Sequence, residues 1–164
     1  MRLTYGKEDF LNFATELYEK DPFYTVKNED INACEKLFVI KDGEKTKARA
    51  GVIYNPNLKY KGLKTLQIGF FEAENDIDAV KFLVEEIKKY ASGEYEYLVG
   101  PINGSTWKKY RVTLPSSYPP FLLDNYNKPY YSELFENSGF ETVGEYTSSI
   151  CKNLLIDENK FRQR

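Results

Sequence analysis

The sequence predicts a mixed α/β domain whose sheet is mostly antiparallel, with a central parallel strand pair and flanking helices. Strand-like segments follow one another with short links between residues 36 and 71, which is typical of an antiparallel meander. An amphipathic helix then separates the strand that ends at Phe71 from the strand that begins at Tyr95, so these two can run parallel through a right-handed crossover. With 164 residues, 41% of them hydrophobic, the chain is expected to form a single domain over residues 1–164.

The first half of the chain predicts one helix and three strands. Apolar residues at helical spacing mark the helix, and Asp21-Pro22 ends it: Phe10, Phe13, Ala14, Leu17 and Tyr18. Strands are expected at Lys36–Lys41, near Thr46–Tyr54 and at Lys64–Phe71, and the first two flank an Asp42-Gly43 turn.

The second half predicts two helices and further strands. A helix is expected over Asn75–Ala91, with Asn75 as its N-cap, and a short strand at Tyr95–Val99 follows. The long connection Asn103–Asn127 has the length of a functional or disordered loop. A last helix is expected over Pro129–Ser138, before a closing pair of strands at Phe140–Val143 and Tyr146–Leu155.

Composition limits the possible chemistry. Histidine is absent, which removes the usual general base, the usual zinc ligand and every histidine-activated nucleophile, so no metal site is expected. The sequence has no run of 18 apolar residues and no secretory segment at its start, which predicts a cytoplasmic protein without a membrane partner. In that compartment Cys34 and Cys151 are expected to be reduced thiols. A net charge of −2 makes a nucleic-acid partner unlikely.

Charge is unevenly spread along the chain. Residues 41–64 hold seven basic and two acidic residues, a net charge of +5, whereas residues 72–86 hold six acidic residues and one basic residue, a net charge of −5. The favoured interpretation is two solvated faces, and the alternative is an acidic mouth for a cationic substrate.

Two segments carry a family resemblance. The late segment Tyr130–Tyr146, YYSELFENSGFETVGEY, resembles the last helix and following strand of the acyl-CoA N-acyltransferase (GNAT) superfamily. Residues 69–103, with GFFEAENDIDAVKFLVEEI and YLVGPIN, are similar to a subset of uncharacterised bacterial GNAT-like proteins. The resemblance spans roughly residues 36–151, implies a GNAT-like fold, and implies acetyl-CoA or another acyl-CoA as cofactor.

The sequence departs from this family at two functional positions. The family's pyrophosphate loop, Q/R-x-x-G-x-G/A, is replaced by the acidic turn Glu72–Asp76, which has no glycine and no basic residue and would repel a pyrophosphate. The family's proton-donating tyrosine falls on Phe135, and Tyr130 and Tyr131 are the possible substitutes one turn earlier.

Together these features predict a candidate site in the wedge where the strands 64–71 and 95–99 diverge. By resemblance, Glu72 is the candidate base and Tyr130 or Tyr131 the candidate acid, although an acid before a helix also has a plain structural role. The candidate cofactor-binding residues are Gly69, Phe70, Phe71, Glu74, Asn75 and Asn103, and the candidate substrate-binding residues are Gln67 and Trp107. A lone tryptophan such as Trp107 is more often an anchor on the core.

Two functions follow from this prediction. The first is an acyl-CoA-dependent N-acetyltransferase that acts on a small-molecule or peptide amine. The second is a non-catalytic binding or assembly module of the same fold that has lost acyl-CoA binding, as the acidic turn and Phe135 favour. The many aromatic residues would then supply an interface, including that of a possible homodimer.

Overall fold

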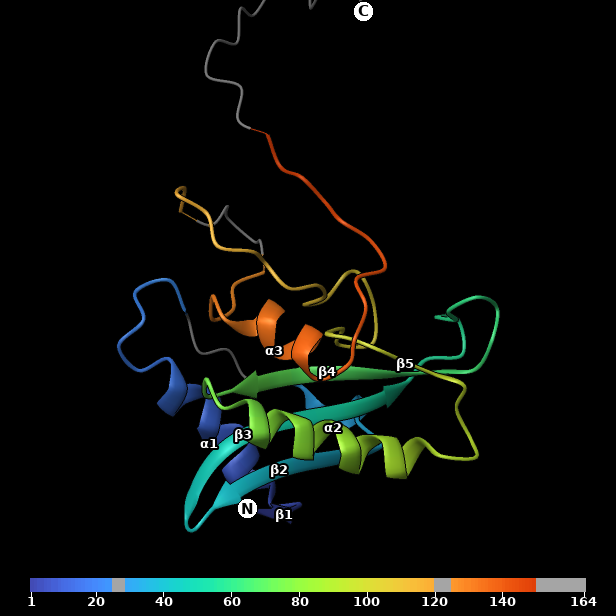
Figure 1. Ribbon diagram of the computed structural model, residues 1–164, viewed down its shortest axis with the longest axis horizontal. Helices are drawn as coiled ribbons and strands as arrows, with labels where there is room; N and C mark the ends of the chain where they lie inside the picture. The colour runs from blue at the N-terminus through green and yellow to red at the C-terminus, as the bar shows by residue number, and fades with distance from the viewer. Residues whose placement is uncertain (25–28, 120–124, 150–164) are drawn as a thin grey trace, which may run out of the picture.

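The computed structural model describes residues 1–24, 29–119 and 125–149. Five strands form one sheet in chain order (Figure 1): β1 (Arg2–Thr4), β2 (Lys36–Asp42), β3 (Lys45–Tyr54), β4 (Thr65–Ala73) and β5 (Tyr97–Val99). Neighbouring strands are antiparallel except β4 and β5, which are parallel with Gln67 opposite Val99. The predicted mixed α/β class and the predicted parallel pair are therefore confirmed.

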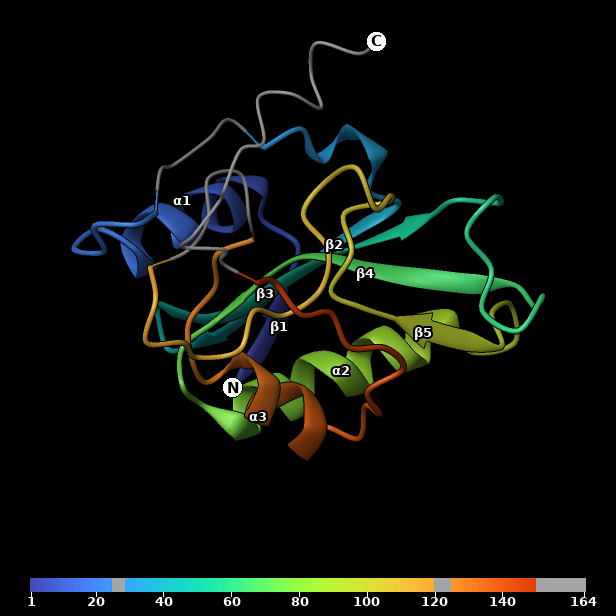
Figure 2. The ribbon, with the colours of Figure 1, turned by 90° about the horizontal axis from the view of Figure 1, so that it is seen from above.

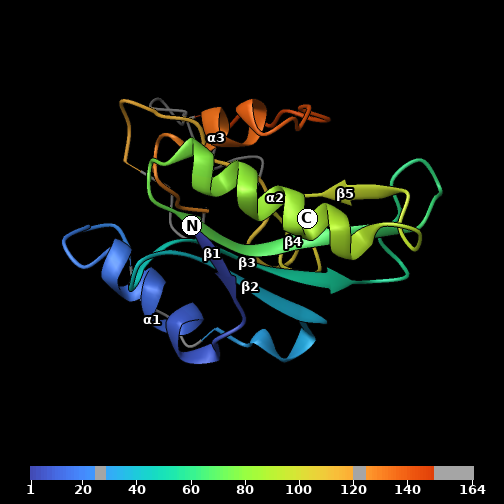
Figure 3. The same cartoon turned by 60° about the horizontal axis from the view of Figure 1, so that its bottom comes forward.

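Three helices cover the two faces of the sheet. Helix α1 (Lys7–Leu17) lies on one face, whereas α2 (Ile77–Ala91) and α3 (Tyr131–Asn137) lie on the other, as Figure 3 shows. The larger core lies under α2 and α3 and joins their buried residues to Leu66, Ile68 and Phe71 of β4. A smaller core under α1 includes Phe10 and Phe70.

A bulge in β4 changes which face of the sheet its last residues point to. Arg49 of β3 lies opposite Glu72 and Gly51 lies opposite Gly69, so two residues of β4 face one of β3 between them. Phe70 adopts a left-handed backbone conformation there, with φ of 51°. The extra residue puts both Phe70 and Glu72 on the α1 face, while Phe71 faces α2.

The structure differs from the sequence prediction at the start of α2 and in two short elements. The N-cap of α2 is Asp76 instead of Asn75, because the Asp76 carboxylate accepts a hydrogen bond from Ala79 N at 3.0 Å. Two short elements were not predicted, β1 and a 3-10 turn at Ile31–Ala33, because three residues carry too little periodicity to be recognised.

The expected closing strands are not formed in the part of the chain that the structure describes. Residues 141–149 are exposed, have no regular structure and extend away from the sheet (Figure 1), so the expected strand at Phe140–Val143 is wrong. The expected strand at Tyr146–Leu155 has no regular structure as far as Ser149, and the rest lies outside the described residues. As a result, β5 is the last strand of the described sheet.

Two other expectations concern the chain as a whole. Within the described ranges, no helix is both long and apolar enough to cross a bilayer. Cys34 is a half-buried free thiol, and burial raises its pKa to about 11, whereas Cys151 lies outside the described residues.

Candidate functional site

Glu72 is the centre of the candidate site. It is the penultimate residue of β4, and its side chain is only 1% exposed. Its Oε2 atom accepts hydrogen bonds from the hydroxyls of Tyr131 at 2.6 Å and of Tyr18 at 2.8 Å. Its Oε1 atom accepts a hydrogen bond from Lys109 Nζ at 3.0 Å. Residues 18, 72, 109 and 131 thus form one cluster, in which three donors surround a buried carboxylate.

Helix α3 fixes two tyrosines against the end of β4. The Tyr131 hydroxyl accepts a hydrogen bond from Ala73 N at 2.9 Å while it donates to Glu72. The Tyr130 hydroxyl donates to Ala73 O at 3.0 Å. The structure therefore brings together the three residues that the sequence assigned to acid–base chemistry.

Burial makes these tyrosines weak acids. Burial, with the charges of Glu72 and Glu74 nearby, raises the pKa of Tyr130 to about 12. Burial and the Glu72 charge hold the pKa values of Tyr131 and Tyr18 well above 10. All three phenols therefore stay protonated at neutral pH and act as hydrogen-bond donors.

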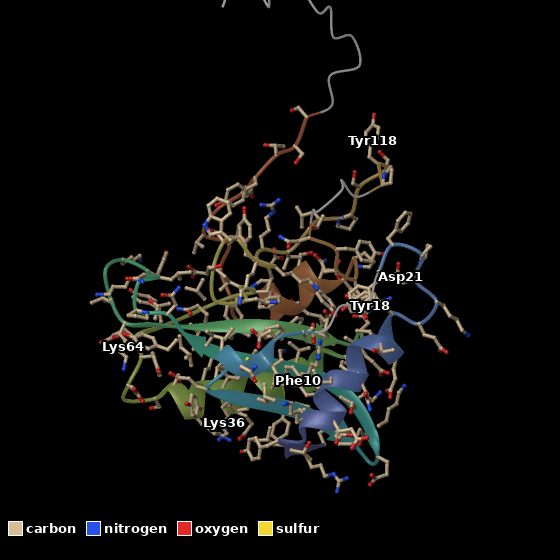
Figure 4. The ribbon with its side chains drawn as sticks, turned by 180° about the vertical axis from the view of Figure 1, so that it is seen from behind. Phe10, Tyr18, Asp21, Lys36, Lys64 and Tyr118 are labelled. Carbon is tan, nitrogen blue, oxygen red and sulfur yellow. The ribbon has the colours of Figure 1, made fainter. Side chains whose placement is uncertain are left out.

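Tyr18, at the C-terminal end of α1, links the cluster to a second aromatic residue. Its ring stacks on that of Tyr24 with the centroids 3.8 Å apart and the planes at 8°. The Lys109 ammonium lies 5.8 Å from the centre of the Tyr24 ring. Figure 4 shows Tyr18 at the end of α1, near Asp21 and well above Phe10.

Arg49 is a second buried charge next to the cluster. It is fully buried, and its guanidinium pairs with Glu29 at 2.7 Å, hydrogen bonds to Phe10 O and lies over the Phe10 ring. Glu29 therefore balances the charge of Arg49, and Lys109 balances that of Glu72. The Arg49 Nε atom is buried and has no hydrogen-bond partner within the described part of the chain.

The wedge where β4 and β5 diverge is filled by the chain itself. After Val99, the segment from Gly100 crosses over β4 (Figure 2), where Ile102 N donates to Ile68 O at 2.8 Å. The Asn103 Oδ1 atom accepts from Phe70 N at 2.8 Å. A Cβ added to Gly69 would lie only 2.8 Å from Ile102 O, so glycine is what permits this close crossing.

A small cavity opens beside this crossing. Only about 20 Å³ of it is open to the centre of a water molecule, which is room for about one water and far less than a ligand pocket offers. Three candidate residues of the sequence analysis, Phe71, Asn103 and Tyr131, line it together with the cations Lys109 and Arg111. Gln67 does not line it, since its side chain is buried and its Nε2 donates to Thr65 O.

The charge of the acidic turn after β4 is balanced by lysines of the same chain. Glu74 pairs with Lys45 at 2.6 Å and with Lys47 at 2.7 Å, so the basic segment 41–64 and the acidic segment 72–86 meet here. The Asp76 carboxylate occupies the N-terminus of α2, where a phosphate would bind in a cofactor cradle. Asn75 lies between them, next to the cap.

The remaining candidates lie apart from the cluster. The Trp107 side chain is 97% exposed, so its interpretation as a core anchor is wrong. Phe135 is buried, and its ring packs against Phe71 with centroids 4.7 Å apart. Sequence reasoning missed two bonds to Glu72, that from the Tyr18 hydroxyl at the end of α1 and that from Lys109, which lies 37 residues away.

The comparisons with known proteins bear on the fold. No protein-family model matches the sequence, and neither does any curated protein. TTHA1254 of Thermus thermophilus, solved as a point mutant, is similar in structure, with a TM-score of 0.52 and 14% identity over 92% of this chain and 96% of that one.

A transcriptional regulator from Bacillus halodurans C-125 is also similar, with a TM-score of 0.54 and 12% identity over 92% of this chain and 99% of that one. At such identities the likeness concerns the fold alone. Among the described residues, no group of three or more Cys, Asp or Glu side chains could hold a metal ion.

Proposed function

We propose that this chain is a non-catalytic binding module of the GNAT-like fold, in which the chain's own groups fill the cofactor half of the site. The observation that carries the proposal is the hydrogen bond from Phe70 N to Asn103 Oδ1 at 2.8 Å. In the acyltransferases that the sequence resembles, the backbone of this strand pairs with the pantetheine arm of acyl-CoA. Here Asn103 takes the place of a ligand amide.

The neighbouring groups of β4 support the same function. Ile102 N donates to Ile68 O. The Tyr131 hydroxyl accepts a hydrogen bond from Ala73 N, and the Tyr130 hydroxyl donates one to Ala73 O. A pantetheine would have to displace several of these bonds, each of which leaves a buried polar group without a partner when it breaks.

The pyrophosphate end of the cofactor is opposed by charge. A bound pyrophosphate would lie near Glu74 and Asp76, and it would compete with the Asp76 carboxylate for the N–H groups of the first turn of α2. The cavity beside β4 is also too small for acyl-CoA.

A second candidate function is acyl-CoA-dependent N-acyl transfer to an amine, with acetyl-CoA or another acyl-CoA as donor. The contact between Glu72 and Tyr131 at 2.6 Å favours it, because it joins a candidate base to a candidate acid. In that reaction the amine nitrogen attacks the acyl carbon and the carbon–sulfur bond breaks. Glu72 takes the proton from the amine, directly or through water, and Tyr131 or Tyr130 gives one to the thiolate.

The proton balance makes this second function the weaker one. A free thiol has a pKa of about 8.5, whereas the pKa of Tyr130 is raised to about 12 and that of Tyr131 lies well above that of an ordinary phenol. Transfer of a proton from either phenol to a thiolate is therefore uphill.

Calorimetric titration with acetyl-CoA and with longer acyl-CoAs separates the two functions. The binding module predicts no heat and no thermal shift at millimolar ligand. Asn103→Ala is the matched variant, since it uncovers Phe70 N without changing the charge of the site. Saturable acyl-CoA binding by the unmodified protein, with amine-dependent release of free CoA that Tyr131→Phe reduces, would overturn the proposal.

A module of this kind acts through a partner or a second copy of itself, and the exposed aromatic residues supply a surface. Trp107 is almost fully exposed, and Tyr118 (Figure 4) is 53% exposed on the same long connection. Size-exclusion chromatography with light scattering tests this part of the proposal. A protein that is strictly monomeric and purifies without a partner would weaken the assembly role.

A further inference from the structure

The two oxygens of Glu72 have different kinds of partner. Both tyrosine hydroxyls donate to Oε2, whereas the partner of Oε1 is the ammonium of Lys109 at 3.0 Å. The phenols hold the carboxylate in one orientation, and this orientation presents Oε1 to a cation. A buried carboxylate needs such a cation, because an uncompensated charge at this depth is costly.

The space around the ammonium suits a cation. The Tyr24 ring lies 5.8 Å from Lys109 Nζ, and stacking on Tyr18 holds this ring in place. A carboxylate together with the face of an aromatic ring is a combination that suits ammonium groups. Two other nearby cations have acidic partners of their own, since Arg49 pairs with Glu29 and Lys128, which lies over the Tyr18 ring, pairs with Asp21. Neither takes the place of an ammonium at Oε1.

Lys109 reaches this place from the solvent side. Its side chain is 33% exposed while that of Glu72 is 1% exposed. Lys109 belongs to the long connection after β5, where Asn103 N pairs with Lys109 O and the nearby Trp107 projects into solvent. The buried carboxylate thus lies beneath a partly exposed lysine of the same chain.

We propose that Glu72 Oε1 and the Tyr24 ring form a binding site for a primary ammonium ion, which Lys109 occupies as an internal ligand and from which an external primary amine displaces it. The exchange replaces one monovalent cation by another, so Glu72 keeps its countercharge throughout. A quaternary ammonium lacks the N–H group that Oε1 accepts. This inference rests on the proposed function and names its ligand class: the cofactor half of the site is filled, and the amine half is retained.

Chemical rescue of Lys109→Ala tests the site. The variant leaves the Glu72 charge without its cation, and we expect its melting temperature to fall by about 5–10 °C. Methylammonium, ethylammonium and butylammonium chloride should restore at least about half of this loss in a saturable manner, as linkage to ligand binding requires. Tetramethylammonium chloride and sodium chloride at the same ionic strength should not.

Three controls make the result specific. Lys108→Ala removes the neighbouring lysine, whose ammonium is not one of the three donors to Glu72, and should show neither the loss nor the rescue. In the double variant Lys109→Ala with Glu72→Gln, the rescue should disappear. In the unmodified protein, butylammonium should shift the backbone amide resonances of Lys109 and Tyr24 in heteronuclear NMR spectra, and this readout remains valid if the alanine variant does not fold.

The outcomes separate this inference from the proposed function. Rescue that is equal for tetramethylammonium and butylammonium, or absent, together with unshifted Lys109 and Tyr24 amides, overturns the amine site whatever the acyl-CoA titration shows. Acyl-CoA binding with specific amine rescue overturns only the proposed function, and leaves the amine site as the acceptor site of an enzyme.

Discussion

The hydroxyl of Tyr131 is expected to contribute more to the free energy of unfolding than any other tyrosine hydroxyl of the cluster. The substitution Tyr131→Phe removes this hydroxyl and keeps the ring. The ring keeps its edge-to-face contact with Phe71, with centroids 5.1 Å apart. Two interactions are lost: the 2.6 Å bond to the Glu72 carboxylate and the bond from Ala73 N. A hydrogen bond to a charged group contributes about 1.5–3 kcal/mol, and a buried N–H left without a partner costs about 1–3 kcal/mol. Since one hydroxyl serves both, we expect a loss of about 3 kcal/mol in the free energy of unfolding.

Tyr130→Phe is the matched control. It removes a neighbouring hydroxyl whose single bond goes to a neutral carbonyl, Ala73 O, and it should cost about 1 kcal/mol. Urea denaturation followed by far-UV circular dichroism measures both, because the sole tryptophan is exposed and reports little on folding. If Tyr131→Phe costs no more than Tyr130→Phe, the assignment of Tyr131 as the bond between α3 and β4 is refuted.

Three further predictions follow from other contacts. Burial acts to raise the pKa of Glu74, but hydrogen bonds from Lys45 and Lys47 outweigh it and hold the pKa below 4.5. The ionised Glu74 therefore stabilises the folded protein above about pH 4.5, and this stabilisation is lost as the pH falls through the lowered pKa. Glu74→Gln should therefore flatten the decline in unfolding free energy between about pH 6 and pH 3, by up to about 1 kcal/mol, and an unchanged slope would contradict this. Gly69→Ala should lower the free energy of unfolding by about 1–3 kcal/mol, because the added Cβ would lie 2.8 Å from Ile102 O. Gly144→Ala, where the Cβ would have nothing within 4 Å, should leave it unchanged. Equal effects of the two substitutions would argue against the close crossing at Gly69. Trp107→Ala should change the unfolding free energy by less than about 0.5 kcal/mol, and acrylamide should quench the tryptophan fluorescence of the native protein as readily as that of the unfolded one; a shielded indole would exclude the exposed position.

Much of the fold could be predicted because its long elements carry strong periodic patterns. The stripe from Phe10 to Tyr18 identifies a buried helix face, the apolar run Leu66–Phe71 identifies a buried strand, and the helix between residues 75 and 91 makes a parallel crossover possible. The expected strand at Phe140–Val143 could not be predicted correctly from the same kind of pattern. Strand propensity at Phe140–Val143 reflects fit to a half-buried sheet, and residues 141–149 are exposed and have no such surface around them.

The candidate site could be predicted in part. Glu72, Tyr130 and Tyr131 were found through the family resemblance, which could be aligned because a strand end and a helix start are each recognisable locally. The role of Lys109 could not be found, because its pairing with Glu72 depends on how the long connection after β5 crosses the sheet. Tyr18 is buried as its place in the apolar stripe of the first helix predicts, but the bond from its hydroxyl to Glu72 could not be read from that stripe.

The chain-order arrangement of the sheet has a consequence for how the protein folds. The hairpins β2–β3 and β3–β4 close short loops, whereas the bonds from Tyr131 to β4 join residues 58 and 59 positions apart. Loop-closure entropy favours the meander first and the docking of α3 later. Loss of the Tyr131 hydroxyl should then accelerate unfolding and leave the refolding rate nearly unchanged. The amide proton of Ala73 should likewise exchange with solvent through partial opening of α3, faster than the amides at the centre of β3.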